Sequence, residues 1–290
     1  MAKILITGAK GQLGQCLLDA ASLFPNHHVV GYDINKLDIC EPDAAYKTAK
    51  RAQAEVVINC AAYTDVDRAE QESDRAYALN RWGVRELVKA CDRLGMVFIH
   101  LSTDYVFDGL TSTPYTEEDK PNPLSVYGAS KFAGEAYALS YERGIVVRTS
   151  WLYAPHGANF LSSVLRLGTE QKELLVVNDQ IGSPTFAPHL ADALLRMAGE
   201  IERTEAHSSL MGLYHFSNQG ACSRFDFVQK VKEYAPLEAE IVPVSSSFYP
   251  TPARRPAFSA LHTKKIEETF GIVPPQWDEG IKSFITWKSI

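Results

Sequence analysis

Short apolar runs alternate with longer amphipathic segments through the first half of the chain. The apolar runs predict β-strands at 3–7, 29–33, 56–60, 97–102 and 145–149, and helical spacing predicts helices at 12–23, 74–94 and 127–143. Because the strand segments are continuously apolar, we expect helices to cover both faces of their sheet. The βαβα order therefore predicts an α/β fold built on a doubly wound, Rossmann-type parallel sheet.

After residue 150 the alternation is less regular. Helices are predicted at 160–167, 189–201, 224–234 and 263–270, separated by proline-containing loops at 182–185 and 248–256. Such loops commonly line ligands or join lobes. We therefore expect residues 1–150 to form one domain. Residues 151–290 are expected to form mainly a smaller C-terminal α/β lobe, with some segments returning to the first domain.

Composition narrows the classes of function. The chain has 290 residues, 29 basic and 35 acidic, and its net charge of −6 disfavours a nucleic-acid-binding protein, although a local basic pocket could still bind a small anion. Its five cysteines are scattered and never spaced CxxC, and its eight histidines form no HExxH pair, so neither a disulfide framework nor a metal site is predicted. No stretch approaches 18 apolar residues, so we expect a cytoplasmic protein without a membrane partner.

A glycine-rich loop follows the first predicted strand. Gly8, Gly11 and Gly14 have GxxGxxG spacing and open the predicted helix at 12–23. Glycine lets the backbone turn tightly and approach a pyrophosphate, whose charge is favoured at a helix N-terminus. The loop predicts dinucleotide binding, and the alternative is an ordinary strand-to-helix turn.

Asp33 lies at the end of the second predicted strand. An acid at this place can accept hydrogen bonds from the adenosine ribose and would repel a 2′-phosphate, which favours NADH. Lys10 and Lys36 could attract that phosphate instead. The predicted cofactor is therefore NADPH or NADH, and residues 1–150 are expected to be the dinucleotide-binding domain.

Tyr127 and Lys131 are four residues apart on a predicted helix, so they share one face. A free phenol titrates near ~10, but a neighbouring ammonium favours the phenolate and would lower the Tyr127 pKa. The hydroxyl of Thr103 follows the fourth predicted strand. Together these groups suit proton donation to a carbonyl oxygen during reduction.

Six motifs occur in order along nearly the whole chain. They are NCAAYTDVD at 59–67, STDYVFDG at 102–109, PLSVYGASK at 123–131, RTSWLY at 148–153, DQIGSPT at 179–185 and RPAFS at 255–259. Together they resemble the dTDP-4-dehydrorhamnose reductase family of extended short-chain dehydrogenases/reductases. The resemblance implies reduction of the C4 ketone of dTDP-4-dehydro-β-L-rhamnose by NAD(P)H, which gives dTDP-β-L-rhamnose for cell-envelope polysaccharide. The partner would be a dTDP-4-keto-6-deoxy sugar, and the second lobe would bind it.

The resemblance also assigns roles to individual residues. Tyr127 would donate the proton, Lys131 would hold the nicotinamide ribose, and Thr103 would orient the carbonyl. The implied cofactor-binding residues are Gly8, Gly11, Gln12, Leu13, Gly14, Asp33, Asp38, Ile39, Ala61, Ala62, Tyr63, Tyr127 and Lys131. The implied substrate-binding residues are Val66, Thr103, Asp104, Tyr105, Phe107, Tyr127, Trp151 and Arg255, the last against the pyrophosphate. The alternative is that the aromatic residues belong to the core and Arg255 to the surface.

Other functions remain open from the sequence. Nucleotide-sugar dehydratases and epimerases share the loop and the YxxxK pair, but dehydratases follow the catalytic threonine with Asp-Glu, whereas Tyr105 follows Asp104 here. A reductase of another nucleotide 4-keto-6-deoxy sugar, or a regulatory subunit like the beta subunit of methionine adenosyltransferase, also fits. Some relatives hold Mg2+ at a dimer contact through an acidic residue where this chain has Gln15. We therefore predict no metal, and a homodimer is a possible assembly.

Overall fold

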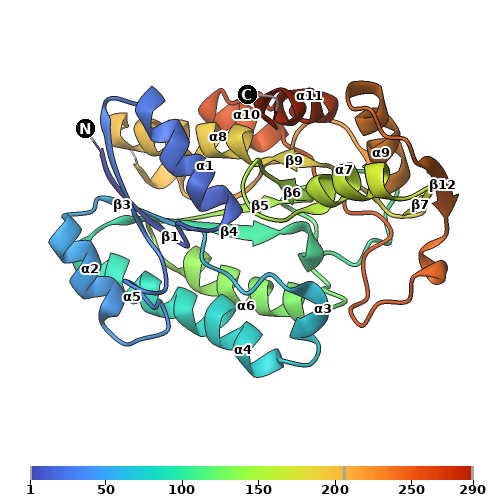
Figure 1. Cartoon of the computed structure of the whole chain (residues 1–290). Coiled ribbons are helices and arrows are strands. Elements are labelled where there is room, and N and C mark those ends of the chain that lie inside the picture. The colour runs from blue at the N-terminus through green and yellow to red at the C-terminus, as the bar shows by residue number, and fades with distance from the viewer. Residues whose placement is uncertain (1, 205–206, 289–290) are drawn as a thin grey trace.

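The computed structural model describes residues 2–204 and 207–288. Its centre is a six-stranded sheet in the order β10-β5-β4-β3-β1-β2, and every neighbouring pair is parallel (Figure 1). The strands are β1 (Ala2–Thr7), β2 (His27–Tyr32), β3 (Val56–Asn59), β4 (Val97–Thr103), β5 (Gly144–Thr149) and β10 (Gly212–His215). All residues of β3 and β4 are buried, as continuous apolar runs predict. The predicted α/β fold class is confirmed.

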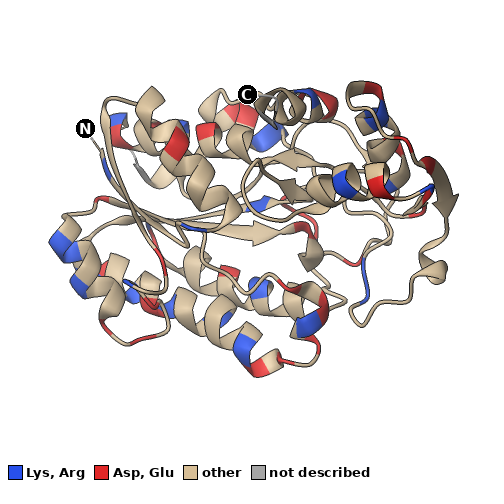
Figure 2. Ribbon diagram, viewed as in Figure 1, with Lys and Arg blue, Asp and Glu red and all other residues tan. Residues whose placement is uncertain are grey.

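Helices cover both faces of the sheet (Figure 1). One face carries α2 (Ala44–Ala52), α3 (Val66–Ala69), α4 (Ser73–Tyr77), α5 (Val84–Leu94) and α6 (Val126–Ser140), and the other carries α1 (Gln12–Ala20), α8 (Ala187–Arg203) and α10 (Lys264–Phe270). Separate apolar clusters fill the space on the two sides. Figure 2 shows basic and acidic residues interspersed over most of these outer helices, whereas α2 carries only basic ones, Lys47, Lys50 and Arg51.

The helix predicted at 74–94 is interrupted. It consists of α4, a π-helical segment at Ala78–Gly83, and α5. In the π-helical segment the buried Asn80 side chain accepts a hydrogen bond from the Tyr63 N–H at 2.8 Å and donates one to the Tyr63 carbonyl at 3.0 Å. The interruption thereby ties the helix to the chain segment that follows β3.

A smaller group of elements lies beyond the carboxyl ends of the central strands (Figure 1). It contains α7 (Phe160–Glu170), α9 (Arg224–Tyr234), α11 (Trp277–Lys288) and the parallel pair β7 (Glu173–Val177) and β12 (Glu240–Val244). Two short pairs lie beside them, β6 (Leu152–Tyr153) with β9 (Thr185–Phe186), and β8 (Ile181–Gly182) with β11 (Cys222–Ser223). A third apolar cluster, which includes Tyr153, Phe227 and Phe284, forms the core of this part.

Two segments of the second half contribute to the first sheet. β10 pairs with β5, and α8 packs against α1 and β1. The sequence pattern predicts α8 but not β10, and it does not predict α2, α11, β7 or β12 either. The division of the chain near residue 150 stays a prediction. Within residues 2–204 and 207–288, no helix is long and apolar enough to span a bilayer.

Candidate active site

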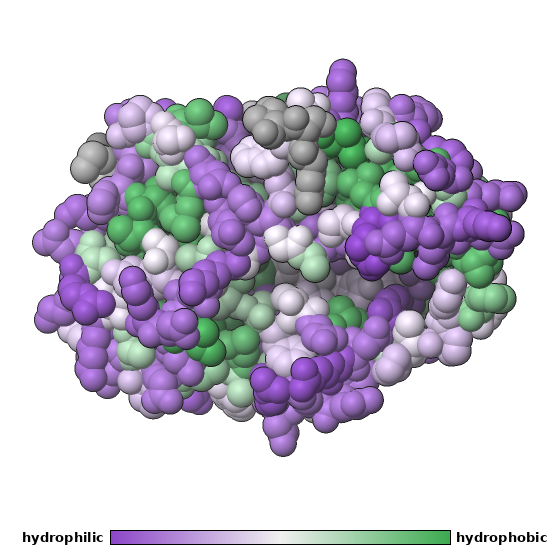
Figure 3. Space-filling model, in the orientation of Figure 1, coloured by the Kyte–Doolittle hydropathy of each residue, from purple (hydrophilic) through white to green (hydrophobic). Residues whose placement is uncertain are grey.

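A cavity of about 670 Å³ opens at the carboxyl ends of the central strands. In a doubly wound sheet, ligands bind in this crevice where the strand order reverses, here between β1 and β3. Its wall contains most residues predicted from the sequence: Gly8, Gly11, Gln12, Leu13, Gly14, Asp33, Asp38, Ile39, Ala61, Ala62, Val66, Thr103, Asp104, Tyr105, Tyr127, Lys131 and Trp151. Figure 3 shows a hollow near the middle of this face, between the regions of α3 and α7.

The glycine loop has the geometry of a phosphate-binding turn. Gly8 has a φ of 64°, and a Cβ on Gly14 would lie 2.4 Å from the Gly8 carbonyl oxygen, so the turn requires glycine at both positions. Helix α1 begins directly after Gly11, and no side chain caps its N-terminus. The first N–H groups of α1 are therefore available to an anion in the cavity.

Asp33 follows β2 at the edge of the cavity. Its carboxylate accepts hydrogen bonds from the Lys10 and Ile34 main-chain N–H groups, each at 2.8 Å. These bonds fix the acid beside the glycine loop, where an adenosine ribose would lie. Thr7 and Asn59 stabilise the neighbouring strand ends through a side-chain hydrogen bond of 2.6 Å.

Tyr127 and Lys131 occupy the first turns of α6. Ser125 caps this helix by accepting the Gly128 N–H at 3.2 Å, so the first turn is fixed to the end of the preceding loop. The Lys131 side chain is buried, and its ammonium donates to the Leu101 carbonyl at 2.5 Å. Thr103 is the last residue of β4 and shares the cavity wall with both residues.

The charge states of these groups follow from burial. Burial raises the pKa of Tyr127 above its usual value, while a hydrogen bond with Thr103 acts in the opposite direction. Burial lowers the pKa of Lys131 to about 8, against the charge of Glu135. The sequence predicts that Lys131 lowers the pKa of Tyr127, but in the structure burial of the phenol raises it. Tyr127 is therefore a neutral phenol near pH 7, which is the form that donates a proton.

Asp104 adds a buried acid next to this group. The Thr103 hydroxyl donates to its carboxylate at 3.0 Å, and the Tyr105 N–H donates to the Thr103 oxygen at 3.2 Å. Burial raises the pKa of Asp104 to about 6, against hydrogen bonds from Ser259 and Thr103. These contacts fix the rotamer of Thr103 toward the cavity.

Trp151 lies on the wall of the same cavity as the glycine loop. Its φ is 44°, a left-handed conformation that is strained for a bulky residue. A Cβ on Gly182 would lie 2.5 Å from the indole ring, and the Arg224 guanidinium lies 4.1 Å from the ring centre. The indole is thus held between the β8 backbone and the first residue of α9. Arg224 is not among the residues predicted from the sequence. The available signal is a cation in the first turn of the predicted helix 224–234, where the helix dipole disfavours it.

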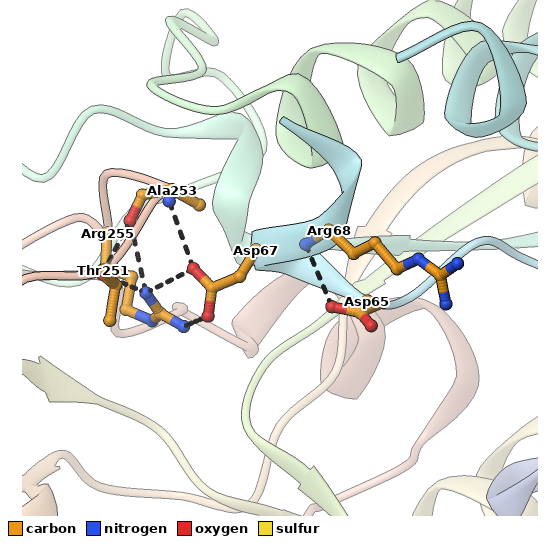
Figure 4. A network of polar contacts seen from close by, with 6 residues as sticks. All are labelled: Asp65, Asp67, Arg68, Thr251, Ala253 and Arg255. Carbon is orange, nitrogen blue, oxygen red and sulfur yellow. Dashed lines mark hydrogen bonds and ion pairs between the residues drawn. The ribbon is translucent and has the colours of Figure 1, made fainter. Parts of the chain in front are cut away.

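A second cavity of about 1110 Å³ lies between α7, β7 and the loop at 246–255. Arg224 lies on the walls of both cavities, and Arg255 lies on the wall of the second. Arg255 forms an ion pair with Asp67 of α3 at 2.8 Å (Figure 4). The second cavity is therefore adjacent to the first, and the two arginines lie where they adjoin.

Three residues predicted for the site lie outside the first cavity. Phe107 is fully buried and stacks on Tyr115 with ring centres 4.0 Å apart, so it belongs to the core rather than to a substrate pocket. The Tyr63 hydroxyl donates to Glu72 at 3.0 Å, and Tyr63 is not on the cavity wall. Arg255 lines only the second cavity. Aromatic spacing in the sequence does not distinguish a cavity wall from a core, which explains the difference at Phe107.

The whole chain is similar in sequence and in structure to known proteins. Residues 2–289 match the family model described as RmlD substrate binding domain. The dTDP-4-dehydrorhamnose reductase of Aggregatibacter actinomycetemcomitans is 40% identical, over 98% of each chain. A crystal structure of such a reductase from Clostridium acetobutylicum has a TM-score of 0.93 at 36% identity and covers 99% of this chain and 100% of its own. Another, from Bacillus anthracis in complex with NADP, has a TM-score of 0.92 at 36% identity, with coverage of 99% and 100%.

Proposed function

Because this chain belongs to the dTDP-4-dehydrorhamnose reductase family, we propose that Thr103, Tyr127 and Lys131 carry out the family reaction in the first cavity. That reaction is the NAD(P)H-dependent reduction of the C4 ketone of dTDP-4-dehydro-β-L-rhamnose to dTDP-β-L-rhamnose, and the chain is an oxidoreductase of dTDP-rhamnose biosynthesis. We assign these roles because Thr103, Tyr127 and Lys131 line the same cavity as the glycine loop.

The cofactor would lie along the sheet edge from β2 to β4. NAD(P)H supplies the hydride that is delivered to C4 of the sugar. The free N–H groups after Gly11 would bind its pyrophosphate, and Asp33 its adenosine ribose. Asp38 and Ile39 would adjoin the adenine, and Lys131 the nicotinamide ribose. The small side chains of Ala61 and Ala62 leave room for the dinucleotide to cross the strand ends.

The neutral phenol of Tyr127 is the proton donor of the reaction. The Tyr127 phenol donates its proton to the C4 oxygen as the hydride arrives, so the ketone gains one hydride and one proton and becomes an alcohol. When the sugar binds, the Thr103 hydroxyl would turn its proton from the Asp104 carboxylate to the same oxygen and orient the carbonyl. The resulting Tyr127 phenolate recovers a proton from solvent. Since Lys131 is one turn along α6, its ammonium stabilises that phenolate once it forms.

The substrate would extend over both cavities. The deoxysugar would lie against Trp151, with Val66, Asp104 and Tyr105 on the same wall. The thymidine half would occupy the second cavity, and Arg255 would bind the pyrophosphate between the two halves. This placement keeps the nucleotide away from the cofactor site. A homodimer stays a prediction.

One assay tests the function. NADH and NADPH absorbance is followed separately with enzymatically prepared dTDP-4-keto-6-deoxy sugar, and we expect one cofactor to be oxidised for each sugar reduced. An epimerase or dehydratase returns its cofactor unchanged, and a regulatory subunit binds without turnover. Sugar conversion without net cofactor oxidation, or no conversion at all, would contradict the proposal.

A further inference from the structure

Two arginines lie where the cavities meet. Arg224, the first residue of α9, lines both cavities, and Arg255 lines the second. The phenol of Tyr105, which lines the first cavity, interacts with both guanidinium groups. Because two positive guanidinium groups lie near one phenol, the electrostatic potential at this place is positive. In a chain of net charge −6, such a local positive potential favours an anion.

The two arginines differ in how their charge is balanced. The Asp67 carboxylate accepts from Arg255 at 2.8 and 3.1 Å, and it also accepts the Ala253 N–H at 3.1 Å (Figure 4). Arg224 forms no ion pair with any residue in the described ranges 2–204 and 207–288. The carboxylate of Asp104 acts on it only through the longer-range electrostatic interaction. Asp67 therefore balances the charge of Arg255, and that of Arg224 is left for a ligand.

Aromatic rings fix the position of Arg224. Its guanidinium lies 4.1 Å from the centre of the Trp151 ring and 5.0 Å from that of Phe160. A guanidinium that rests its face on a ring keeps N–H groups at its edge for oxygen acceptors. The stacking itself uses no N–H donor of Arg224. A hydrogen bond with the Tyr105 phenol uses one of them and leaves others at the edge of the guanidinium for a ligand.

We propose that Arg224 binds the pyrophosphate of the dTDP-sugar together with Arg255, as a clamp between the sugar and nucleotide halves. This inference rests on the proposed function, because the sugar must reach Thr103 and Tyr127 while the nucleoside occupies the second cavity. A guanidinium fork matches paired phosphate oxygens, and the fork of Arg224 pairs with no carboxylate of the described residues. The fork of Arg255 is engaged by Asp67, so Arg255 would contribute its remaining N–H groups to the same diphosphate. Arg224 is then a determinant of affinity for diphosphate over nucleoside, and it does not act in proton or hydride transfer.

The test compares two probes that differ only in the diphosphate. The Kd values of dTDP and of thymidine are measured by calorimetry for the wild-type protein, Arg224→Gln and Arg224→Lys. We expect Arg224→Gln to weaken dTDP binding by about tenfold or more, the scale of a lost charge-assisted hydrogen bond, and to change thymidine binding by less than about twofold. Arg224→Lys should recover part of the dTDP affinity.

Arg166→Gln is the matched control, because Arg166 is an exposed arginine of α7 that pairs with Glu170 and lines neither cavity. It should leave both Kd values unchanged. Equal losses for dTDP and thymidine in Arg224→Gln would assign Arg224 a structural role through Trp151 and overturn the proposal, as would an unchanged dTDP affinity. If Arg224→Gln fails to fold, Arg224→Lys is compared with the wild-type protein instead, and equal losses of dTDP and thymidine affinity in that variant would overturn the proposal.

Turnover of the wild-type protein separates this inference from the proposed function. If the protein reduces the keto sugar but dTDP binding is independent of Arg224, only the clamp is wrong. If dTDP binding depends on Arg224 but no keto sugar is reduced, the clamp stands and the proposed reaction is wrong.

Discussion

Tyr127 is the residue on which the proposed chemistry depends most directly. Tyr127→Phe keeps the ring in place and removes the proton donor, so we expect kcat to fall by the order of 10²-fold or more. Dinucleotide affinity should change little, because the glycine loop and Lys131 are untouched. Steady-state kinetics and a fluorescence titration with NADH measure both quantities. A variant that keeps more than about a third of the wild-type kcat would show that another group donates the proton.

The lowered pKa of Lys131 leads us to expect that cofactor affinity depends on pH. Its pKa is lowered to about 8 by burial, so its ammonium is charged below that pH and neutral above it. We therefore expect the Kd of NADH to increase as the pH rises through about 8. In Lys131→Met the affinity should be lower throughout and should lose this step. A wild-type Kd that stays constant from about pH 7 to pH 9 would contradict the role of the charge.

We expect the carboxylate of Asp33 to influence the choice between NADH and NADPH. Its carboxylate is held beside the glycine loop, where it would accept bonds from the ribose hydroxyls of NADH and repel a 2′-phosphate. Both cofactors should function, with a modest preference for NADH, since Lys10 and Lys36 attract the phosphate. We expect Asp33→Ala to raise the kcat/KM ratio of NADPH over NADH. An unchanged ratio would mean that Asp33 does not face the ribose.

Among the secondary-structure elements, those that the sequence predicts well are the ones with the strongest local pattern. β1, β3, β4 and β5 are continuously apolar because helices cover them on both sides. β10 has only the four residues Gly212–His215, and its pairing with β5 depends on a distant part of the chain. A local pattern carries no information about such a partner. The same reason applies to Arg224, because its contact with Trp151 joins elements far apart in sequence.

β8 supports Trp151 through a backbone that has no side chain at Gly182. A Cβ there would lie 2.5 Å from the indole, so Gly182→Ala must displace the ring, at a cost of about 1–3 kcal/mol for overpacking. We expect the KM of the keto sugar to rise and the Kd of NADH to stay constant. Kinetics and thermal unfolding measure the two effects. A lower Tm with an unchanged KM would mean that Trp151 does not contact the sugar.

At the scale of the whole molecule, Asp67 and Arg255 join α3 beneath the sheet to the loop at 246–255. The hydrogen bond from Arg255 lowers the pKa of Asp67. The pair therefore stabilises the fold above the ordinary aspartate pKa of ~4, and its contribution is lost as the pH falls through the lower folded value. Since both side chains are partly exposed, the contribution should be about 1 kcal/mol or less.

Asp67→Asn tests this connection. We expect a small decrease in Tm near pH 7 that disappears in strongly acidic solution, together with faster proteolytic cleavage within 246–254. Arg166→Gln, which removes an exposed ion pair elsewhere, controls for the general effect of losing a charge pair. A Tm difference that is the same at all pH values would assign the stabilisation to packing rather than to charge.

The late return of the chain to its first sheet has a consequence for synthesis on the ribosome. When β5 leaves the exit tunnel, its outer edge has no partner, and α1 lacks the cover of α8. Both are completed only after translation through His215. At ~5–20 residues per second the nascent chain carries an open strand edge for a time on the order of seconds. We therefore expect the nascent chain to bind ribosome-associated chaperones, although the strand edge that they would cover is paired in the folded protein.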